Sequence, residues 1–279
     1  MLGKLIKYDL KSMSRAFIPV WCLAPLIALL LSFSVKGTLA WASGSPLTSM
    51  FALGNGMLVM VMGILFFAAL AALFVMTIVF VIQRFWNGLL KEEGYLMFTL
   101  PVHTWELIVS KAVAATIVSF VSILIGIFSG MILMVFSTEE VIRSWFVAWK
   151  YLFSGIFELG PTFWLNVMLF ILLIILGIVQ SIYHIYTAMA IGHLFPTHKV
   201  VGSCVSYIGI SIIVSIVSNI VNACLSTLMP DTWYNYRSYD LMELMGTAYL
   251  LYLMLGTIVE LAAYHVITER ILSTKLNLE

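Results

Sequence analysis

Six stretches of this chain are long and apolar enough to cross a lipid bilayer, and no other feature limits its possible folds as strongly. A helical span needs about 20 apolar residues to cross about 30 Å of hydrocarbon. Hydrocarbon offers the backbone no water, so a span must satisfy its own backbone groups, as a helix does. The six stretches cover about residues 17 to 35, 52 to 82, 112 to 136, 161 to 189, 201 to 228 and 245 to 267. We expect an all-α polytopic membrane protein with six transmembrane helices, in which residues 1 to 279 form a single transmembrane domain.

The composition agrees with a membrane protein. Of the 279 residues, 62% are hydrophobic and 10% are charged, and the mean hydropathy is +1.08. Soluble domains contain about 25% charged residues. The formal net charge of +1 gives no sign of a nucleic-acid partner.

The basic residues predict how the spans are oriented. If the N-terminus is cytoplasmic, ten of the 14 Lys and Arg residues fall in cytoplasmic segments, and the outer segments hold Lys36, Arg143, Lys150 and Arg237. This distribution follows the positive-inside rule. No small-residue cleavage site follows the first span, so we expect that span to be retained. The expected protein is multi-pass, with both termini in the cytoplasm.

Two amphipathic segments accompany the spans. Residues 1 to 16 combine an apolar face with a basic one, which predicts a helix along the cytoplasmic membrane surface. Residues 137 to 160 carry an apolar stripe at helical spacing. A seventh crossing there would place Arg143 and Lys150 in or near hydrocarbon, at about 2.5 to 3.5 kcal/mol each. We prefer six spans and an outer amphipathic helix, either on the outer leaflet or as a structural lid.

The sequence offers no motif for catalysis or metal binding. It contains no GxxxxGK[ST] phosphate loop, no HExxH and no CxxC pair. Its five His residues lack metal-ligand spacing. An intramembrane enzyme would need converging catalytic groups, and a secondary transporter would show repeats and several ionisable groups around a broken helix. We therefore expect no catalytic residues, no metal and no cofactor in this chain.

Polar residues inside the spans are the next candidates, because hydrocarbon offers them no water. Glu260 is the one acidic residue near the middle of a predicted span, and it is either a functional partner for a polar path or a hydrogen-bonded structural residue. Gln180 and His184 lie one turn apart in the fourth span. The fifth span has a polar face, which is a helix contact such as a dimer face or a hydrated path. This face consists of Ser211, Ser215, Ser218 and Asn222. Gly126 and Gly130 form a GxxxG in the third span, which favours helix packing.

Residues 84 to 111, between the second and third spans, form a cytoplasmic segment far longer than a connection requires. Neighbouring helices in a bundle are joined by about 2 to 8 residues. Apolar residues recur at helical intervals, Pro101 stops any helix, and Thr104 with Glu106 can begin the next one. We expect a hairpin of helical pieces that docks onto a soluble protein; a helix on the membrane surface is the alternative.

Within this segment, KEEGYLMFTLPVHTWELIVSK from Lys91 to Lys111 resembles a motif in membrane subunits of bacterial ABC-2 type transporters, particularly those of Gram-positive bacteria. The shared pattern is EGYL-x-x-TLP followed by a short spacer and SK. The resemblance implies a coupling helix that binds a cytoplasmic ABC ATPase subunit carrying ATP and Mg. The positions implied are Glu92, Glu93, Gly94, Tyr95, Leu96, Phe98, Thr99, Leu100 and Pro101.

The same resemblance implies a permease subunit in the bacterial cell membrane. Such a subunit pairs with a second permease subunit, as a homodimer or alternatively a heterodimer, and two separate ATPases drive it. The expected function is export of an amphipathic or hydrophobic substrate, a peptide by analogy with exporters of bacteriocins and phenol-soluble modulins. Export of a lipid or hydrophobic drug, or a non-transporting scaffold or immunity role, are the alternatives.

Overall fold

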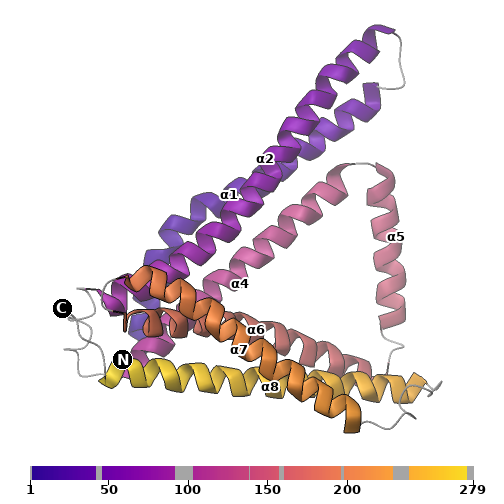
Figure 1. The fold of residues 1–279 in the computed structure, drawn as a ribbon. Helices are drawn as coiled ribbons and strands as arrows, with labels where there is room; N and C mark the ends of the chain where they lie inside the picture. The colour runs from indigo at the N-terminus through magenta and orange to yellow at the C-terminus, as the bar shows by residue number, and fades with distance from the viewer. Residues whose placement is uncertain are drawn as a thin grey trace. The chain divides into compact units, whose positions relative to one another are not determined.

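The computed structural model describes residues 2–41, 46–91, 103–137, 139–156, 160–195, 198–228 and 239–274. Every regular element in these ranges is helical (Figure 1). In chain order the elements are α1 (Leu2–Trp41), α2 (Pro46–Phe85), the π-helix η1 (Trp86–Leu90), α4 (Thr104–Ser137), α5 (Glu139–Ile156), α6 (Pro161–Gly192), α7 (Lys199–Leu228) and α8 (Tyr239–Thr274).

Six of the helices are long and apolar enough to cross a membrane, which confirms the all-helical, six-span prediction. The segments concerned are Gly3–Lys36, Asn55–Leu90, Thr104–Val135, Pro161–Gly192, Lys199–Leu225 and Gly246–Thr274. Each contains most of one predicted span. Within the described residues, α5 is not among the six.

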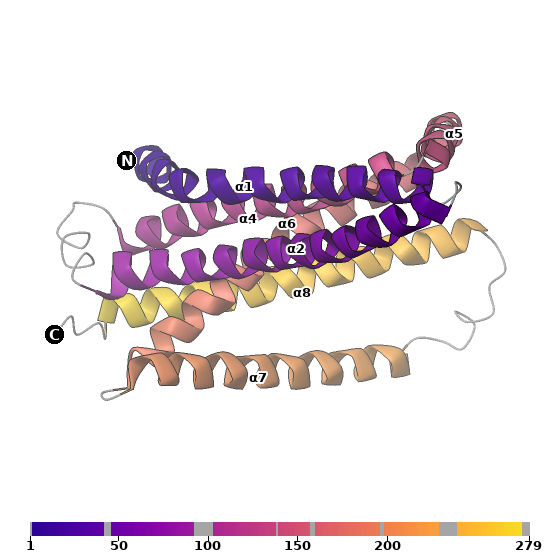
Figure 2. The same ribbon diagram turned by 90° about the horizontal axis from the view of Figure 1, so that it is seen from above.

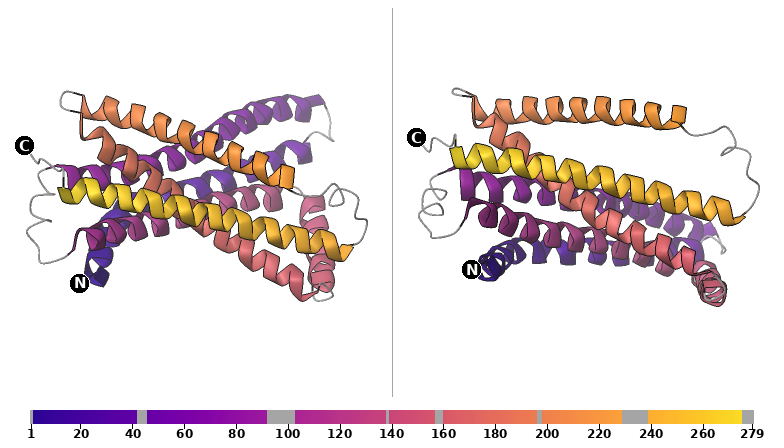
Figure 3. Two further views of the ribbon diagram at one scale, coloured as in Figure 1. Left: turned by 60° about the horizontal axis from the view of Figure 1, so that its bottom comes forward. Right: turned by 90° about the horizontal axis from the view of Figure 1, so that it is seen from below.

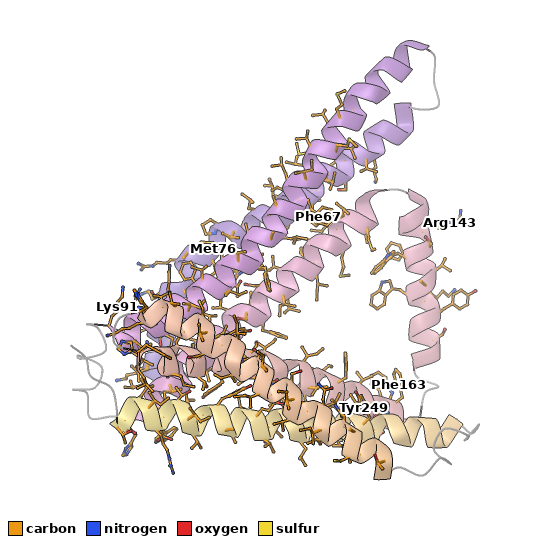
Figure 4. The ribbon with its side chains drawn as sticks, viewed as in Figure 1. Phe67, Met76, Lys91, Arg143, Phe163 and Tyr249 are labelled. Carbon is orange, nitrogen blue, oxygen red and sulfur yellow. The ribbon has the colours of Figure 1, made fainter. Side chains whose placement is uncertain are left out.

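Large apolar side chains on the spans are exposed. Met57 is 72% exposed, Phe67 is 71% exposed and Leu255 is 65% exposed; Figure 4 labels Phe67 on α2. Contiguous apolar surface of this extent is rare on soluble monomers, because water penalises it at roughly 25 cal/mol per Å². A lipid environment removes this penalty, and the chain is therefore a multi-pass membrane protein.

The chain divides into two compact units. The N-terminal unit comprises Lys7–Phe80 and Ile117–Leu159. The C-terminal unit comprises Met1–Ile6, Val81–Thr116 and Gly160–Glu279.

In the N-terminal unit α1 and α2 are antiparallel. The Phe17 and Phe80 ring centroids are 5.0 Å apart. The Asn55 amide donates a hydrogen bond of 3.2 Å to the Ser34 carbonyl oxygen. The pairing of early α1 with late α2, and of late α1 with early α2, defines the opposite directions. Between these contacts lies a small buried core of Ala28, Leu31, Phe66 and Ile132.

The N-terminal residues predicted to form a separate amphipathic helix are continuous with the first span. Residues 2 to 16 are the first part of α1. Lys4, Lys7 and Lys11 are exposed. Pro19 and Pro25 lie inside α1, where each lacks the N–H for one backbone hydrogen bond without ending the helix. A placement of residues 2 to 16 along the membrane surface stays a prediction.

The helix α5 lies within the segment predicted to be amphipathic, residues 137 to 160. The rings of Trp145 and Trp149, one turn apart, have centroids 5.7 Å apart. Arg143, labelled in Figure 4, and Lys150 are exposed. Their spacing of seven residues places them on one face of α5, and the two tryptophans lie on another face. Its place on the outer leaflet stays a prediction.

In the C-terminal unit α6 packs against both α7 and α8. Figure 2 and Figure 3 show α6 crossing α8 obliquely and turning into α7 at one end. Among the described residues, three hydrogen bonds between two side chains join α6 to α8: Asn166 with Thr247, Gln180 with Glu260, and Thr187 with Thr268. The partners are separated by 81, 80 and 81 residues. A nearly constant separation means that the two helices run parallel, as two spans with one crossing between them must.

The turn from α6 to α7 is closely packed around two glycines. A Cβ on Gly192 would overlap the side chain and backbone of Ser203, and one on Gly202 would lie 2.6 Å from the Phe195 ring. Only a residue without a side chain fits where backbones approach this closely. By contrast, a Cβ on Gly126 or Gly130 would meet no heavy atom within 4 Å, so this GxxxG makes no close helix contact among the described residues.

Candidate functional site

The residues implied in ATPase coupling lie outside the described part of the structure. These are Glu92, Glu93, Gly94, Tyr95, Leu96, Phe98, Thr99, Leu100 and Pro101. The structure does describe both ends of the segment that contains them. We call these ends, Val81–Lys91 and His103–Thr116, the base of the segment.

The base is helical and buried. The second span continues beyond residue 82 through Phe85 and then η1. The next helix begins at Thr104, as predicted, with Glu106 in its first turn. Leu89, Leu90, Leu107 and Ile108 are at most 3% exposed and belong to one apolar core with Tyr186 and Met189 of α6 and with Leu272 of α8. The base is thus part of the core of the C-terminal unit.

Two aromatic contacts join the base to the C-terminal end of α6, which the predicted topology places on the cytoplasmic side. The Phe85 and Tyr186 rings stack with centroids 4.1 Å apart and planes inclined by 20°. The Trp86 ring meets the His193 ring edge-on at 5.9 Å. These contacts fix η1 against the last turns of α6.

His193 follows directly after the fourth span and adds a titratable group to this contact. Burial lowers its pKa from the ordinary value, and the positive charge of Lys199 lowers it further. A hydrogen bond with the Leu90 backbone acts in the opposite direction. Because burial and Lys199 together outweigh the hydrogen bond with Leu90, the pKa of His193 is lowered and the neutral form is favoured.

The base also buries the Ser-Lys pair that ends the motif. Ser110 is 1% exposed and Lys111 is 2% exposed. The Ser110 hydroxyl donates to the Leu107 carbonyl oxygen at 2.9 Å. A Cβ on Gly88 would lie 2.7 Å from Lys111 Nζ and 2.9 Å from its Cε. The absence of a side chain at Gly88 therefore makes room for the buried Lys111 chain between η1 and α4.

A second candidate site lies among α6, α7 and α8, centred on the intramembrane acid. Glu260 is the middle residue of the span Gly246–Thr274, nearer the centre than the sequence predicted. The Gln180 side-chain amide donates a hydrogen bond to Glu260 Oε2. Glu260 also lies close enough to His184 and Tyr264 to interact with them electrostatically.

His184 lies between two tyrosine rings. Its ring stacks on Tyr207 of α7 with centroids 4.4 Å apart, and on Tyr264 of α8 with centroids 5.3 Å apart. The Nε2 atom of His184 is 3.4 Å from Ser211 Oγ. We call Gln180, His184, Tyr207, Ser211, Glu260 and Tyr264 the His184 cluster.

Two of the four predicted polar residues of the fifth span border a groove on α7. The groove has a volume of about 470 Å³ and is lined by Tyr207, Ile208, Ser211, Ile212, Ser215 and Ile216. Tyr207 and Ser211 belong both to the groove and to the His184 cluster. The structure thus brings Ser211 next to His184, with which Glu260 interacts electrostatically.

The other two polar residues of that face lie apart from the groove. Asn222 accepts a hydrogen bond of 2.9 Å from the Tyr252 hydroxyl of α8. Ser218 is half-buried and does not line the groove. Asn219, their neighbour, donates to the Ser215 carbonyl oxygen at 2.8 Å. Only part of the predicted face is therefore a candidate path, and Asn222 serves a helix contact.

Sequence reasoning missed Tyr207 and the Thr187–Thr268 contact. The Thr187 and Thr268 hydroxyls are 3.0 Å apart, and Thr187 also donates to the Tyr264 carbonyl oxygen at 3.2 Å. One signal was present in the spacing: polar residues recur at Gln180, His184 and Thr187 on α6. The same kind of signal applied to Tyr207, which lies four residues before Ser211 and therefore on the polar face of the fifth span.

The described residues hold no group of three or more His, Cys, Asp and Glu side chains that could bind a metal ion. Comparisons of the chain with family models, with curated proteins and with solved structures find no match in any of the three.

Proposed function

We propose that this chain is the membrane-spanning subunit of an ATP-driven exporter of the ABC-2 type. In this proposal, two permease subunits, preferably identical, pair with cytoplasmic ATPase subunits that bind ATP and Mg. They move an amphipathic or hydrophobic substrate out of a bacterial cell, and a peptide is the substrate that we propose. The six helices able to cross a membrane and the motif from Lys91 to Lys111 support the proposal.

One structural observation carries the proposal: the base of the coupling segment belongs to the core formed with α6 and α8. A closely packed core transmits displacement, because its side chains cannot move independently. A force applied to residues 92 to 102 by a partner would therefore act on α6 and α8. Two packing arrangements with different affinity for the ATP-bound partner would make this a two-state switch.

The first experiment tests the partner. The full chain, affinity-tagged and purified from its own host in mild detergent, should retain a separate ATPase. Tyr95→Glu and Leu96→Glu should abolish that co-purification, because a charge at an apolar docking position must be desolvated. Tyr151→Glu on α5 is the matched control, since Tyr151 is 74% exposed and far from the segment in sequence. Full retention of the ATPase by the Tyr95 and Leu96 variants would contradict the coupling role.

The second experiment tests transmission through the base. Gly88→Leu would displace the buried Lys111 chain, and Gly177→Leu on α6 would place the same side chain where a Cβ meets no heavy atom within 4 Å. In vesicles with the ATPase, Gly88→Leu should keep ATPase binding and lose peptide-stimulated ATP hydrolysis and peptide accumulation. Gly177→Leu should retain both. A complex that binds the ATPase but moves no peptide, lipid or drug would instead favour a scaffold or immunity role.

A further inference from the structure

We propose that the groove on α7 and the His184 cluster bind an amphipathic organic cation. The positively charged head would lie at Tyr207 and Ser211, and the apolar body would lie along the isoleucines of the groove. This inference rests on the proposed function only in calling such a molecule the substrate; the binding site itself stands on the geometry below.

The charge of the cluster selects a cation. Glu260 is the one acidic residue among the six, and none of the six is Lys or Arg. Its hydrogen-bond partner is the Gln180 amide, which carries no charge, and in this proposal Glu260 is ionised when the cation is bound. An ionised carboxylate in a span is costly unless a positive charge compensates it. Because the dielectric constant is low there, the attraction for a nearby cation is much stronger than in water.

Tyr207 offers the head group its binding surface. One face of the ring stacks on His184, yet the residue is 44% exposed and lines the groove. Aromatic faces attract ammonium groups through the negative potential of the ring, and most strongly where water is excluded. Beside it, the Ser211 hydroxyl donates to the Tyr207 carbonyl oxygen at 2.8 Å, so the Ser211 oxygen can accept a hydrogen bond from a ligand.

The groove beyond the head group suits an alkyl chain or apolar side chains. Ile208, Ile212 and Ile216 line it and are 59%, 54% and 54% exposed. The groove is open along α7, and its volume is about 470 Å³. An anionic amphipath of the same shape would be repelled by Glu260. A neutral one would gain nothing from the acid or from the tyrosine face.

Octyltrimethylammonium is a suitable probe, with octanol and octyl sulfate as neutral and anionic counterparts of equal chain length. Radiolabelled probe is equilibrated by dialysis with the full chain in nanodiscs of zwitterionic lipid, and partition into empty nanodiscs is subtracted. We expect saturable binding that octanol and octyl sulfate do not displace. Glu260→Gln should weaken it about tenfold or more, as loss of one charge interaction in a low dielectric predicts.

Two matched controls separate the site from general effects on the fold. Glu269→Gln removes another acid of α8, which pairs with His265 at 3.8 Å, and should leave binding unchanged. Tyr207→Leu should weaken binding, whereas Tyr249→Leu, at an exposed tyrosine of α8, should not. Glu260→Gln keeps an acceptor for the Gln180 amide, so its melting temperature should stay close to that of the wild type.

Three results would overturn the proposal: no saturable binding by the wild type, equal binding by Glu260→Gln, or equal displacement by octanol. The last would identify the groove as a site for lipid tails. The assay contains no ATPase. A failure here therefore leaves the export proposal standing, and failed co-purification of an ATPase leaves the cation site standing.

Discussion

The Gln180 amide donates a hydrogen bond to the Glu260 carboxylate and thereby joins α6 to α8 near the middle of a membrane span. With the pairs Asn166–Thr247 and Thr187–Thr268, this bond fixes the register of two parallel helices. The same α6 also contacts the base of the segment between Arg84 and Lys111 through Tyr186 and His193. A rotation or shift of α6 would therefore change both the His184 cluster and the base.

Gln180→Leu should destabilise the α6–α8 pair by about 1 kcal/mol, the usual size of an interhelical hydrogen bond in a membrane. It removes the donor and leaves the Glu260 carboxylate without its hydrogen bond. Gln180→Leu combined with Glu260→Leu should recover much of this loss, because no polar group is then left unpaired. Thermal unfolding in detergent of the four proteins in the cycle measures the coupling. Strict additivity of the two substitutions would contradict the interaction.

Gly192→Ala should destabilise the protein by about 1 to 3 kcal/mol, the usual cost of forcing extra volume into a closely packed contact. The added Cβ would overlap the backbone of Ser203 as well as its side chain, so a rotamer change alone cannot relieve it. Gly177→Ala on the same helix meets open space and should be neutral or slightly stabilising, because alanine favours helix. Equal melting temperatures for the two variants would count against the close α6–α7 approach.

The contact of His193 with the base should make stability depend on pH. Its pKa is lowered in the folded protein, by burial and then by Lys199, so the unfolded chain binds more protons just below its usual pKa of about 6.5. Stability should therefore be fully present above about pH 6.5 and be lost as the pH falls through the lowered pKa.

His193→Gln should flatten this dependence, whereas His103→Gln, at an exposed position, should preserve it. Melting temperatures in detergent from about pH 5 to about pH 8 provide the measurement. A wild type whose melting temperature rises on acidification across this window would show that the sign is wrong.

The predicted topology places Lys91 inside the cell and Arg143 outside. Both side chains are exposed, so Lys91→Cys and Arg143→Cys are suitable labelling sites after Cys22, Cys204 and Cys224 are replaced by Ser. A membrane-impermeant maleimide should label Arg143→Cys on intact cells and Lys91→Cys only after permeabilisation. The protein without cysteines is the control. Labelling of both positions on intact cells would contradict an odd number of crossings between them.

The predictions that agree best with the structure are those that depend on local sequence. The helix that begins at Thr104, with Glu106 in its first turn, follows from a stop at Pro101 and from the run of apolar residues after it. Such signals act within one helix, and neighbouring turns are enough to define them. The amphipathic helix over residues 1 to 16 stays a prediction; residues 2 to 16 are the first part of α1, and no local pattern showed that this helix continues through Pro19.

The candidate sites depended on contacts between distant residues. The sequence singled out Glu260, Gln180 and Ser211, but it did not show that His184 joins them, since His184 and Tyr207 lie on different helices. It also favoured the GxxxG of Gly126 and Gly130 for packing, whereas among the described residues helices α6 and α7 approach closely at Gly192 and Gly202. A small residue permits a close approach, but the partner helix decides whether one occurs.

The sequence by itself determined that the chain is a helical membrane protein with six spans, because the transfer of apolar residues into hydrocarbon is nearly additive along each helix. It also marked the segment from Arg84 to Lys111 as more than a connection. Only the tertiary structure decided that the base of this segment packs with α6 and α8, and that Gln180, His184 and Glu260 form one cluster. The reason is that helix register and rotation are set by side-chain packing between helices, and this packing depends on partners about 80 residues apart that no local pattern identifies.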